Sequence, residues 1–363
     1  MTMLSTLDNR SASAPGRRSR LAAWARLLFG TPLNAGLTIA FGALLIWSVP
    51  GLVRWAIVDA VFSPRDPDAC RAAVGACWGF IAAKSGQILF GIYPPAERWR
   101  PLLVCIVILI LLVASVWPRL WGRRLVYAWA AALGLVMVLM LGGVFGLASV
   151  PTSSWGGLPI TLILTVVAIG IAFPLSIGLA LARRSRMPAV HLLATLLIET
   201  IRGLPLLSLL FVASIMLPLF LPEALLPDKF VRALVALTIF AAAYLAEVVR
   251  GGLQAIPKGQ FEAAEALGLS FWQRQRLVIL PQALRIVIPA LANTIIVMIK
   301  NTSLVLVVGL FDLISSGKAA LADPAWPSPA AETYLFIGAI YFALAFGFAR
   351  FADFLERRAK VDR

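Results

Sequence analysis

Long apolar runs separated by short polar segments are the dominant pattern of this sequence. Charged residues, proline and glycine bound the runs, and about 20 consecutive apolar residues are enough for a helix that crosses a membrane. The runs lie at 35–53, 101–117, 125–147, 158–182, 193–220, 231–249, 282–310 and 333–349. We therefore predict an all-α integral membrane protein with about eight transmembrane helices.

The composition agrees with this pattern and excludes several chemistries. Of the 363 residues, 61% are hydrophobic and only 13% are charged, which is not the balance of a soluble chain. The single histidine, His191, and the three cysteines do not have the spacing of a zinc site. No GxxxxGK[ST] phosphate-binding loop is present. We expect no metal-dependent enzyme and no cofactor in this chain, and if the protein uses ATP, another chain must bind it.

The basic residues are distributed unevenly between alternate loops. With the N-terminus in the cytoplasm, the segments on that side hold 20 Lys and Arg residues and the outer segments hold 9. Basic residues favour the cytoplasmic side, so both termini are expected there. The first apolar run begins only after residue 33, behind several arginines and without a cleavage site, so residues 1–34 are expected to remain as a cytoplasmic tail.

The net charge of +15 is explained by this topology. A net positive charge of this size is also typical of nucleic-acid-binding proteins. Here the excess falls on the cytoplasmic side, where anionic lipid lies. We expect membrane lipid as a partner and no nucleic acid.

The first outer loop, at about 54–100, contains Cys70 and Cys77. In an oxidising compartment these cysteines can form a disulfide, but their spacing is equally compatible with two free thiols. Cys105 lies within a span and is expected to pack there. Gly142 and Gly146 have the GxxxG spacing that can seat a neighbouring helix.

The loop between the sixth and seventh spans, residues 250–281, has a detailed local pattern. Residues 260–267 are strong helix formers, preceded by Pro257 and followed by Gly268, which predicts a helix of about two turns. Ser270 and Gln273 fit a capping box that starts a second helix. A two-turn helix is not stable alone in water, so we expect it to dock in a groove of a soluble partner.

Several motifs of this chain resemble those of a known family. Glu262-Ala263-Ala264, then Gly268, then Leu280-Pro281 resemble the EAA motif of the permease subunits of bacterial ATP-binding-cassette importers; the family favours Ile where Val278 stands. Three further segments resemble the polar amino acid branch, which contains the histidine, glutamine, arginine and opine permeases: IRGLPLL at 201–207, EVVRGG at 247–252 and KNTSL at 300–304.

The resemblance covers roughly residues 157–352 and implies a domain organisation. The last five spans would form a type I importer core, and the three spans before it resemble one of the two permeases of the general L-amino acid importer. The expected parts are a cytoplasmic tail at 1–34, the additional spans with their periplasmic loop at 35–156, the core at 157–353 with its EAA loop at 251–281, and a tail at 354–363.

The same resemblance implies a function and partners. The chain would be a permease subunit in the bacterial inner membrane, translocating amino acids by alternating access. Its partners would be two copies of an ATPase subunit, a second permease that is related but not identical, and a periplasmic amino acid binding protein. The residues that would couple it to a cleft of the ATPase subunit are Glu262, Ala263, Ala264, Gly268, Leu280 and Pro281.

Charged side chains within spans are candidates for a substrate path, because they are costly there. Glu199 and Arg202 are three residues apart on one helical face and can simply neutralise each other, as can Glu247 and Arg250. In the seventh span, residues 300–303 interrupt an apolar helix with hydrogen-bonding groups, which is typical of a broken helix that faces a cavity. Alternatively, the lysine among them extends to the membrane boundary. The hypothetical path residues are Lys300, Asn301, Thr302, Ser303, Glu199 and Arg202.

Two other classes of protein compete with the importer. A membrane-embedded lipid-modifying enzyme would need clustered His, Asp or Ser near the headgroups, and His191 has no acidic neighbour in the sequence. A channel would leave the patterned loop at 250–281 without a role.

Overall fold

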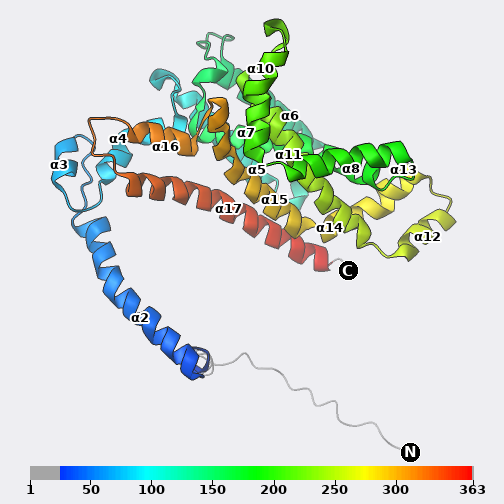
Figure 1. Cartoon of the computed structure of the whole chain (residues 1–363), viewed down its shortest axis with the longest axis horizontal. Helices are drawn as coiled ribbons and strands as arrows, with labels where there is room; N and C mark the ends of the chain where they lie inside the picture. Colours follow the sequence, from blue (N-terminus) through cyan, green and yellow to red (C-terminus); the bar gives the residue numbers. More distant parts are fainter. Residues whose placement is uncertain (1–24, 362–363) are drawn as a thin grey trace, which may run out of the picture. The chain divides into compact units, whose positions relative to one another are not determined.

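The computed structural model describes residues 25–361, which are almost entirely helical (Figure 1). They divide into two units: a small one made of the residues up to Val61 with Ala72–Cys77, and a large one made of Phe62–Arg71 with all residues from Trp78 onward. Residues 1–24 of the predicted N-terminal tail, and the last two residues of the C-terminal tail, lie outside the described residues.

The small unit consists mainly of helix α2 (Pro32–Val53), which corresponds to the first predicted span. The Thr31 side chain caps it by accepting from the backbone N–H of Asn34 (3.1 Å). The helix buries none of its residues, and Trp47 is 81% exposed. An apolar helix with no buried face within the protein is suited to a lipid environment. It continues as the π-helix η1 (Arg54–Val58).

Most predicted spans are present as long apolar helices. Six helices of the described chain are long and apolar enough to cross a membrane, or seven when one bent pair counts as a span. These are Pro32–Val58, Arg123–Leu141, Gly157–Arg183, Lys229–Gln254, Ile288–Val308, Ala330–Arg358 and the pair Pro188–Gly203 with Leu206–Phe220. The remaining predicted span is the 16-residue helix α5 (Trp99–Ala114).

Helices α7 (Gly157–Arg183) and α11 (Lys229–Gln254) pack along each other at the centre of the large unit. Small buried residues on both helices, such as Ala168 and Ala241, allow their backbones to approach closely. Helices α5 and α6 (Arg123–Leu141) pack on each other, and α5 packs on α7. Helices α15 (Ile288–Asn301) and α17 (Ala330–Val361) form another pair, in which α15 contacts α7 and α11.

The fifth predicted span, 193–220, is wrong as a single helix. It consists of α8 (Pro188–Gly203) and a second helical segment made of α9 (Leu206–Phe211), η5 (Val212–Met216) and α10 (Leu217–Phe220), bent by 102° from α8. Pro205 disfavours the helical conformation at Leu204, whose φ and ψ are −95° and 137°. The continuous apolar run conceals this break.

The third predicted span is too long at its C-terminal end, because α6 ends at Leu141. Gly142 and Gly146 lie beyond the helix with φ of 66° and 75°, so they do not form a GxxxG helix face. Gly142 is required for a close approach: a Cβ there would lie 2.1 Å from the carbonyl oxygen of Ala148. The fully buried Arg100 holds this turn by donating to the carbonyls of Leu139 (2.5 Å) and Ala148 (2.8 Å).

The segment from residue 54 to residue 100, predicted as the first outer loop, is folded. It contains α3 (Pro67–Ala72), α4 (Trp78–Phe90) and η2 (Pro95–Glu97), and α4 packs against α16 (Leu313–Leu321) of the core. Phe80 stacks edge-on against Trp326 with 5.6 Å between ring centroids, and Lys84 forms an ion pair with Asp323. Cys70 and Cys77 are both disulfide-bonded, whereas Cys105 is a buried free thiol.

The Lys84–Asp323 ion pair predicts an acid-sensitive contact between α4 and the segment that follows α16. The hydrogen bond from Lys84 lowers the pKa of Asp323 below its ordinary value of 3.8. A carboxyl group whose pKa is lower in the folded than in the unfolded protein stabilises the fold at pH values above its ordinary pKa. This stabilisation is lost as the pH falls through the lowered pKa of the folded state. Melting temperatures of the protein and of Lys84→Met should therefore differ at pH 6 and converge as the pH falls below 3.8 and through the lowered pKa. A difference that persists unchanged at low pH would contradict this role.

Candidate functional site

The polar loop after α11 contains the short helix that the sequence predicts. Helix α12 (Lys258–Ala266) begins after Pro257 and ends in a Schellman motif. The N–H of Leu269 donates to the carbonyl of Ala264 (3.2 Å), and the N–H of Gly268 donates to that of Glu265 (2.9 Å). Gly268 has φ +71°, which a residue without a Cβ adopts at little cost. The predicted glycine stop is confirmed.

Helix α12 is attached by one face and exposed on the other. Ala264 is buried and Phe261 is half-buried, whereas Glu262, Ala263 and Leu267 are exposed. Figure 1 shows α12 at one end of the large unit, near α13 and α14. The exposed face therefore lies where a second protein can reach it.

The second half of the loop is also helical, as predicted. Helix α13 (Phe271–Arg274) starts with the predicted capping box between Ser270 and Gln273, continues as the π-helix η7 (Gln275–Ile279), and leads into α14 (Leu280–Ile286). Arg274 forms an ion pair with Glu265 of α12 (3.2 Å). The loop is thus an ordered helical hairpin, in which Leu280 and Pro281 form the first turn of α14.

The hairpin is anchored by a small apolar core of its own. Its buried members come from α7, α11 and the loop: Ala180, Val249, Leu253, Ile256, Ile279 and Ala283. Gly252 permits the contact between α11 and α14, since a Cβ there would lie 2.6 Å from the carbonyl oxygen of Ala283 and 2.8 Å from Val287 Cγ1.

Replacing Gly252 by valine should therefore displace the hairpin. The backbone carbonyl of Ala283 cannot move away independently, so α14 must shift, and overpacking of this kind costs about 1–3 kcal/mol. The neighbouring Gly251 has open space around its Cβ position and serves as the control. Proteolysis of the loop should accelerate in Gly252→Val and not in Gly251→Val. If the loop is cleaved at the same rate in both variants, the contact between α11 and α14 at Gly252 does not hold the hairpin in place.

The outer surface of the hairpin exposes large apolar side chains. Leu267 is 78% exposed, Trp272 70% and Leu277 64%. Clustered exposed apolar residues next to charged ones are typical of a protein interaction surface. We call Leu267, Phe271, Trp272 and Leu277 the hairpin patch.

A second feature is an ion-pair network formed by three helices. Arg183 of α7 donates to Glu199 of α8 (2.5 Å) and to Glu247 of α11 (2.6 Å). Arg250 donates to Glu247 (2.8 Å), and Arg202 lies 3.6 Å from Glu247 and 3.9 Å from Glu199. The two pairs predicted within helices are present, but Arg183 joins them and forms the shortest contacts.

The network and the hairpin are neighbours. Arg184, next to Arg183, lies over the ring of Phe261 of α12, with 5.7 Å to the centroid. Burial lowers the pKa of the Arg184 guanidinium, and the nearby Arg250 lowers it further. Helix α12 therefore contacts the C-terminal end of α7, next to Arg183 of the network.

The predicted break at residues 300–303 is a change of helix type. Helix α15 ends at Asn301 and continues as the 3₁₀-helix η8 (Thr302–Val308). The hydroxyls bond their own backbone: Thr302 donates to the carbonyl of Ile299 (2.7 Å) and Ser303 to that of Lys300 (2.9 Å). The interruption of the predicted span 282–310 lies instead at Val287, between α14 and α15.

Lys300 is exposed and has no ion-pair partner within residues 25–361, and Asn301 is half-buried. No hydrogen bond or ion pair in that range joins residues 300–303 to Glu199 or Arg202. The two groups of predicted path residues therefore lie in separate polar clusters.

Thr302 belongs to a buried polar cluster that sequence reasoning missed. Its centre is Asp312, which is fully buried and caps α16 by accepting from the N–H groups of Ser315 (3.0 Å) and Ile314 (3.1 Å). The Tyr341 hydroxyl donates to Asp312 (3.2 Å) and also interacts with Thr302. An aspartate directly before an apolar helix is the signal that would have identified this cap.

Comparison with known proteins identifies relatives along the whole chain. The family of binding-protein-dependent transport system inner membrane components matches residues 172–361. An inner membrane amino-acid ABC transporter permease protein of Escherichia coli K12, YhdY, is 47% identical over 360 residues, which cover 98% of each chain. The glutamate/glutamine/aspartate/asparagine transport system permease protein BztC of Rhodobacter capsulatus is 36% identical, with 92% of each chain covered.

One solved structure is similar to about half of the chain. A chain in the crystal structure of an amino acid ABC transporter with histidines is 36% identical, with a TM-score of 0.49, and covers 56% of this chain and 92% of its own length. The family model begins at residue 172, whereas YhdY and BztC align with almost the whole chain, so both also match the segment before it, which includes α5 and α6.

Proposed function

Since this chain belongs to the family of inner membrane components of binding-protein-dependent transport systems, we propose that it is the permease subunit through which amino acids cross the membrane. It is a transport subunit, and its relatives are permeases rather than lipid-modifying enzymes or channels. The amino acid class is supported by the names of both full-length relatives. We propose that both termini face the cytoplasm.

The observation that carries the proposal is the helical hairpin. A two-turn helix capped at a glycine, anchored by a small apolar core and exposing an apolar patch has the form of a rigid plug for another protein. We propose that it docks on an ATPase subunit, with two copies of that subunit in the assembly. A binding protein would deliver the amino acid, and a second permease, related and non-identical, would form the other half of the path.

Each coupling residue has a distinct proposed role. Glu262 and Ala263 would contact the ATPase directly, because they are exposed. Ala264 is buried and would hold α12 against the loop, while Gly268 would fix the direction of the chain after α12. Leu280 and Pro281 would begin the rigid connection to the spans.

Movement of the hairpin would reach the spans through the ion-pair network. Phe261 contacts Arg184, and the adjacent Arg183 joins α7 to α8 and α11. Helices held by one network would move together when the ATPase closes. Glu199 and Arg202 would then lie at the cytoplasmic end of the path.

We propose that Lys300, Asn301 and Ser303 line the path further from the hairpin, whereas Thr302 is buried beside Asp312. Lys300 offers an exposed positive charge to a substrate carboxylate, and Asn301 offers an amide. Uptake of labelled amino acids should fall in Lys300→Ala and Asn301→Ala variants that reach the membrane in normal amounts. Normal uptake by both variants would show that these residues do not line the substrate path. No cofactor within the chain is proposed.

The ATPase contact is tested by co-purification. Leu267→Asp places a charge in the hairpin patch, at its most exposed residue, and should reduce recovery of the ATPase about tenfold or more, as expected for an interface anchor. Leu225→Asp is the control, because Leu225 is 69% exposed in η6 (Glu223–Leu225), outside the hairpin. If both variants retain the ATPase equally, the patch is not the docking surface.

A further inference from the structure

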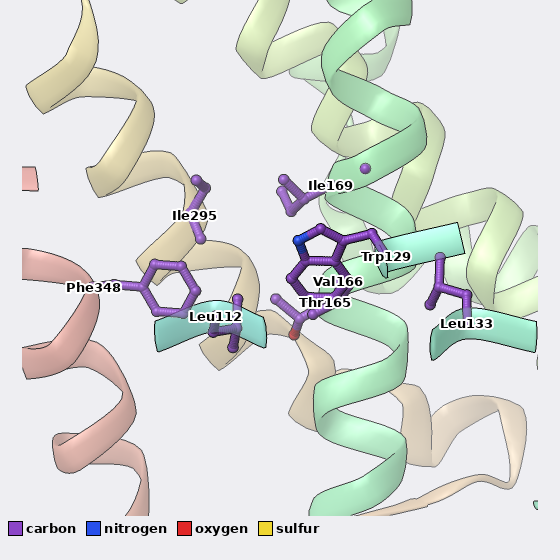
Figure 2. Close-up of a pocket in the computed structure, with 9 residues that line it drawn as sticks. Leu112, Trp129, Leu133, Thr165, Val166, Ile169, Ile295 and Phe348 are labelled. Carbon is purple, nitrogen blue, oxygen red and sulfur yellow. The ribbon is translucent and has the colours of Figure 1, made fainter. Parts of the chain in front are cut away.

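A cavity of about 310 Å³ lies between the additional helices and the core. Its walls are Leu112 of α5, Trp129 and Leu133 of α6, Thr165, Val166, Ile169 and Gly170 of α7, Ile295 of α15 and Phe348 of α17. In Figure 2, Ile295 and Phe348 lie on the opposite side of the cavity from Trp129 and Val166. All of the lining residues except Thr165 keep exposed surface, so the cavity is open to the surroundings.

The lining excludes the transported substrate as the occupant. It contains no charged side chain, and an amino acid would leave its ammonium and carboxylate groups without partners there. An aliphatic chain fits the lining, because apolar side chains from five helices surround it. In a membrane, a cavity that opens between apolar helices faces lipid rather than water.

Hydrogen bonds join the wall of the cavity to a basic connection, the segment with three arginines between α5 and α6. Trp129 Nε1 donates to Ser115 Oγ (3.1 Å), and Trp121 Nε1 donates to the carbonyl of the same serine (2.9 Å). Trp121 lies between Arg119 and Arg123-Arg124 in the segment that joins α5 to α6. One serine, Ser115, therefore links the segment with the arginines to the wall of the cavity through two hydrogen bonds.

The three arginines of this connection are exposed and have no carboxylate partner within residues 25–361. The sequence contains no Asp or Glu between Glu97 and Glu199, so this part of the chain supplies no acid to neutralise them. Trp117 and Trp121 beside them are 57% and 52% exposed, as is typical of residues at a membrane interface.

The depth of the cavity matches a lipid tail. At about 1.5 Å per helical residue, Trp129 lies about 9 Å and Leu133 about 15 Å along α6 from Arg123. One half of the hydrocarbon core is about 15 Å thick. A headgroup held at Arg123 therefore places its acyl chain beside both residues.

We propose that this cavity binds an anionic phospholipid of the cytoplasmic leaflet, with its phosphate on Arg119, Arg123 and Arg124 and an acyl chain against Trp129. The bound lipid joins α5 and α6 to α7, α15 and α17. The additional helices thereby acquire a role: they form half of a lipid site whose other half is the transport core.

Native mass spectrometry of the full transporter complex, with added phosphatidylglycerol or phosphatidylcholine, tests the site. Phosphatidylglycerol should bind one molecule per copy of this chain in preference to phosphatidylcholine. Each arginine near an anionic membrane surface contributes roughly fivefold in affinity, so Arg123→Gln with Arg124→Gln should weaken binding roughly 25-fold.

The cavity itself is tested by filling it. A Cβ at Gly170 meets no atom within 4 Å, so Gly170→Leu extends into the cavity without displacing its walls. Gly178→Leu, at an equally open position on α7 outside the cavity, is the matched control. Phosphatidylglycerol should be lost from Gly170→Leu and retained by Gly178→Leu, with similar melting temperatures in lipid-free detergent. Equal retention by both variants, or equal binding of the two lipids by the unmodified complex, would overturn the proposal.

Discussion

Replacing Glu247 by alanine should destabilise the protein more than any other single change in the ion-pair network. Glu247 is the carboxylate shared by three guanidinium groups, and its side chain is only 14% exposed. Removing it leaves Arg183 and Arg202 with only the more exposed Glu199, and removes the carboxylate that Arg250 binds. The cluster is only half-buried, so the expected cost is about 1–3 kcal/mol, as for a charged hydrogen-bonding partner removed from a site that water can partly reach. The measurement is the melting temperature of the purified chain in detergent.

Glu199→Ala is the matched control for this prediction. Glu199 contacts Arg183 and Arg202 but is 52% exposed, so water can replace it. Exposed ion pairs contribute about 0–1 kcal/mol, and the expected shift in melting temperature is correspondingly small. Equal shifts in the two variants would mean that Glu247 is not the centre of the network.

Replacing Gly268 by valine should abolish ATP-driven uptake with the protein still inserted in the membrane. A β-branched residue at φ +71° is strained by about 1–3 kcal/mol, and relief of that strain breaks the Schellman motif that ends α12. The chain from Leu269 to Trp272 then leaves α12 in another direction, and the hairpin patch loses its shape. The measurement is uptake of labelled amino acids, normalised to the amount of protein in the membrane.

Gly259→Val separates this conformational effect from the simple loss of a glycine. Gly259 lies in the first turn of α12, outside the left-handed region, and its Cβ position is open. Uptake should be retained in this variant, with only the modest loss of helix propensity. If Gly259→Val abolishes uptake as completely as Gly268→Val, the Schellman motif is not the important feature.

The hairpin could be predicted from the sequence because its signals are local. The hydrogen bonds of the Schellman motif at Gly268 and of the capping box at Ser270 and Gln273 each join residues that are at most five positions apart. The apolar runs likewise identify the spans, since a membrane helix needs little beyond length and apolarity. These features do not depend on distant contacts.

The parts that could not be predicted depend on residues far apart in the chain. Arg183 lies 16 residues from Glu199 and 64 from Glu247, so no spacing rule identifies it as the link between the two pairs. The break before Pro205 is concealed because leucine-rich segments flank it on both sides. The position of α4 depends on contacts with α16 and the segment that follows it, more than 200 residues later, such as Lys84 with Asp323.

Residues 300–303 illustrate a different limit. Their polarity predicts a broken helix, yet hydroxyl groups can bond the carbonyl groups of the preceding turn and let the helix continue. Polarity alone does not distinguish these two outcomes. Asp312 was missed for a related reason, because one buried carboxylate can be satisfied by backbone N–H groups and hydroxyls without any basic partner.

Uptake of labelled L-amino acids by cells that lack this chain tests the central claim most directly. The account predicts that binding-protein-dependent uptake falls to background and is restored by the complete chain, but not by Gly268→Val present in equal amount. Unchanged uptake of every amino acid in cells without the chain, or full restoration by Gly268→Val, would contradict it.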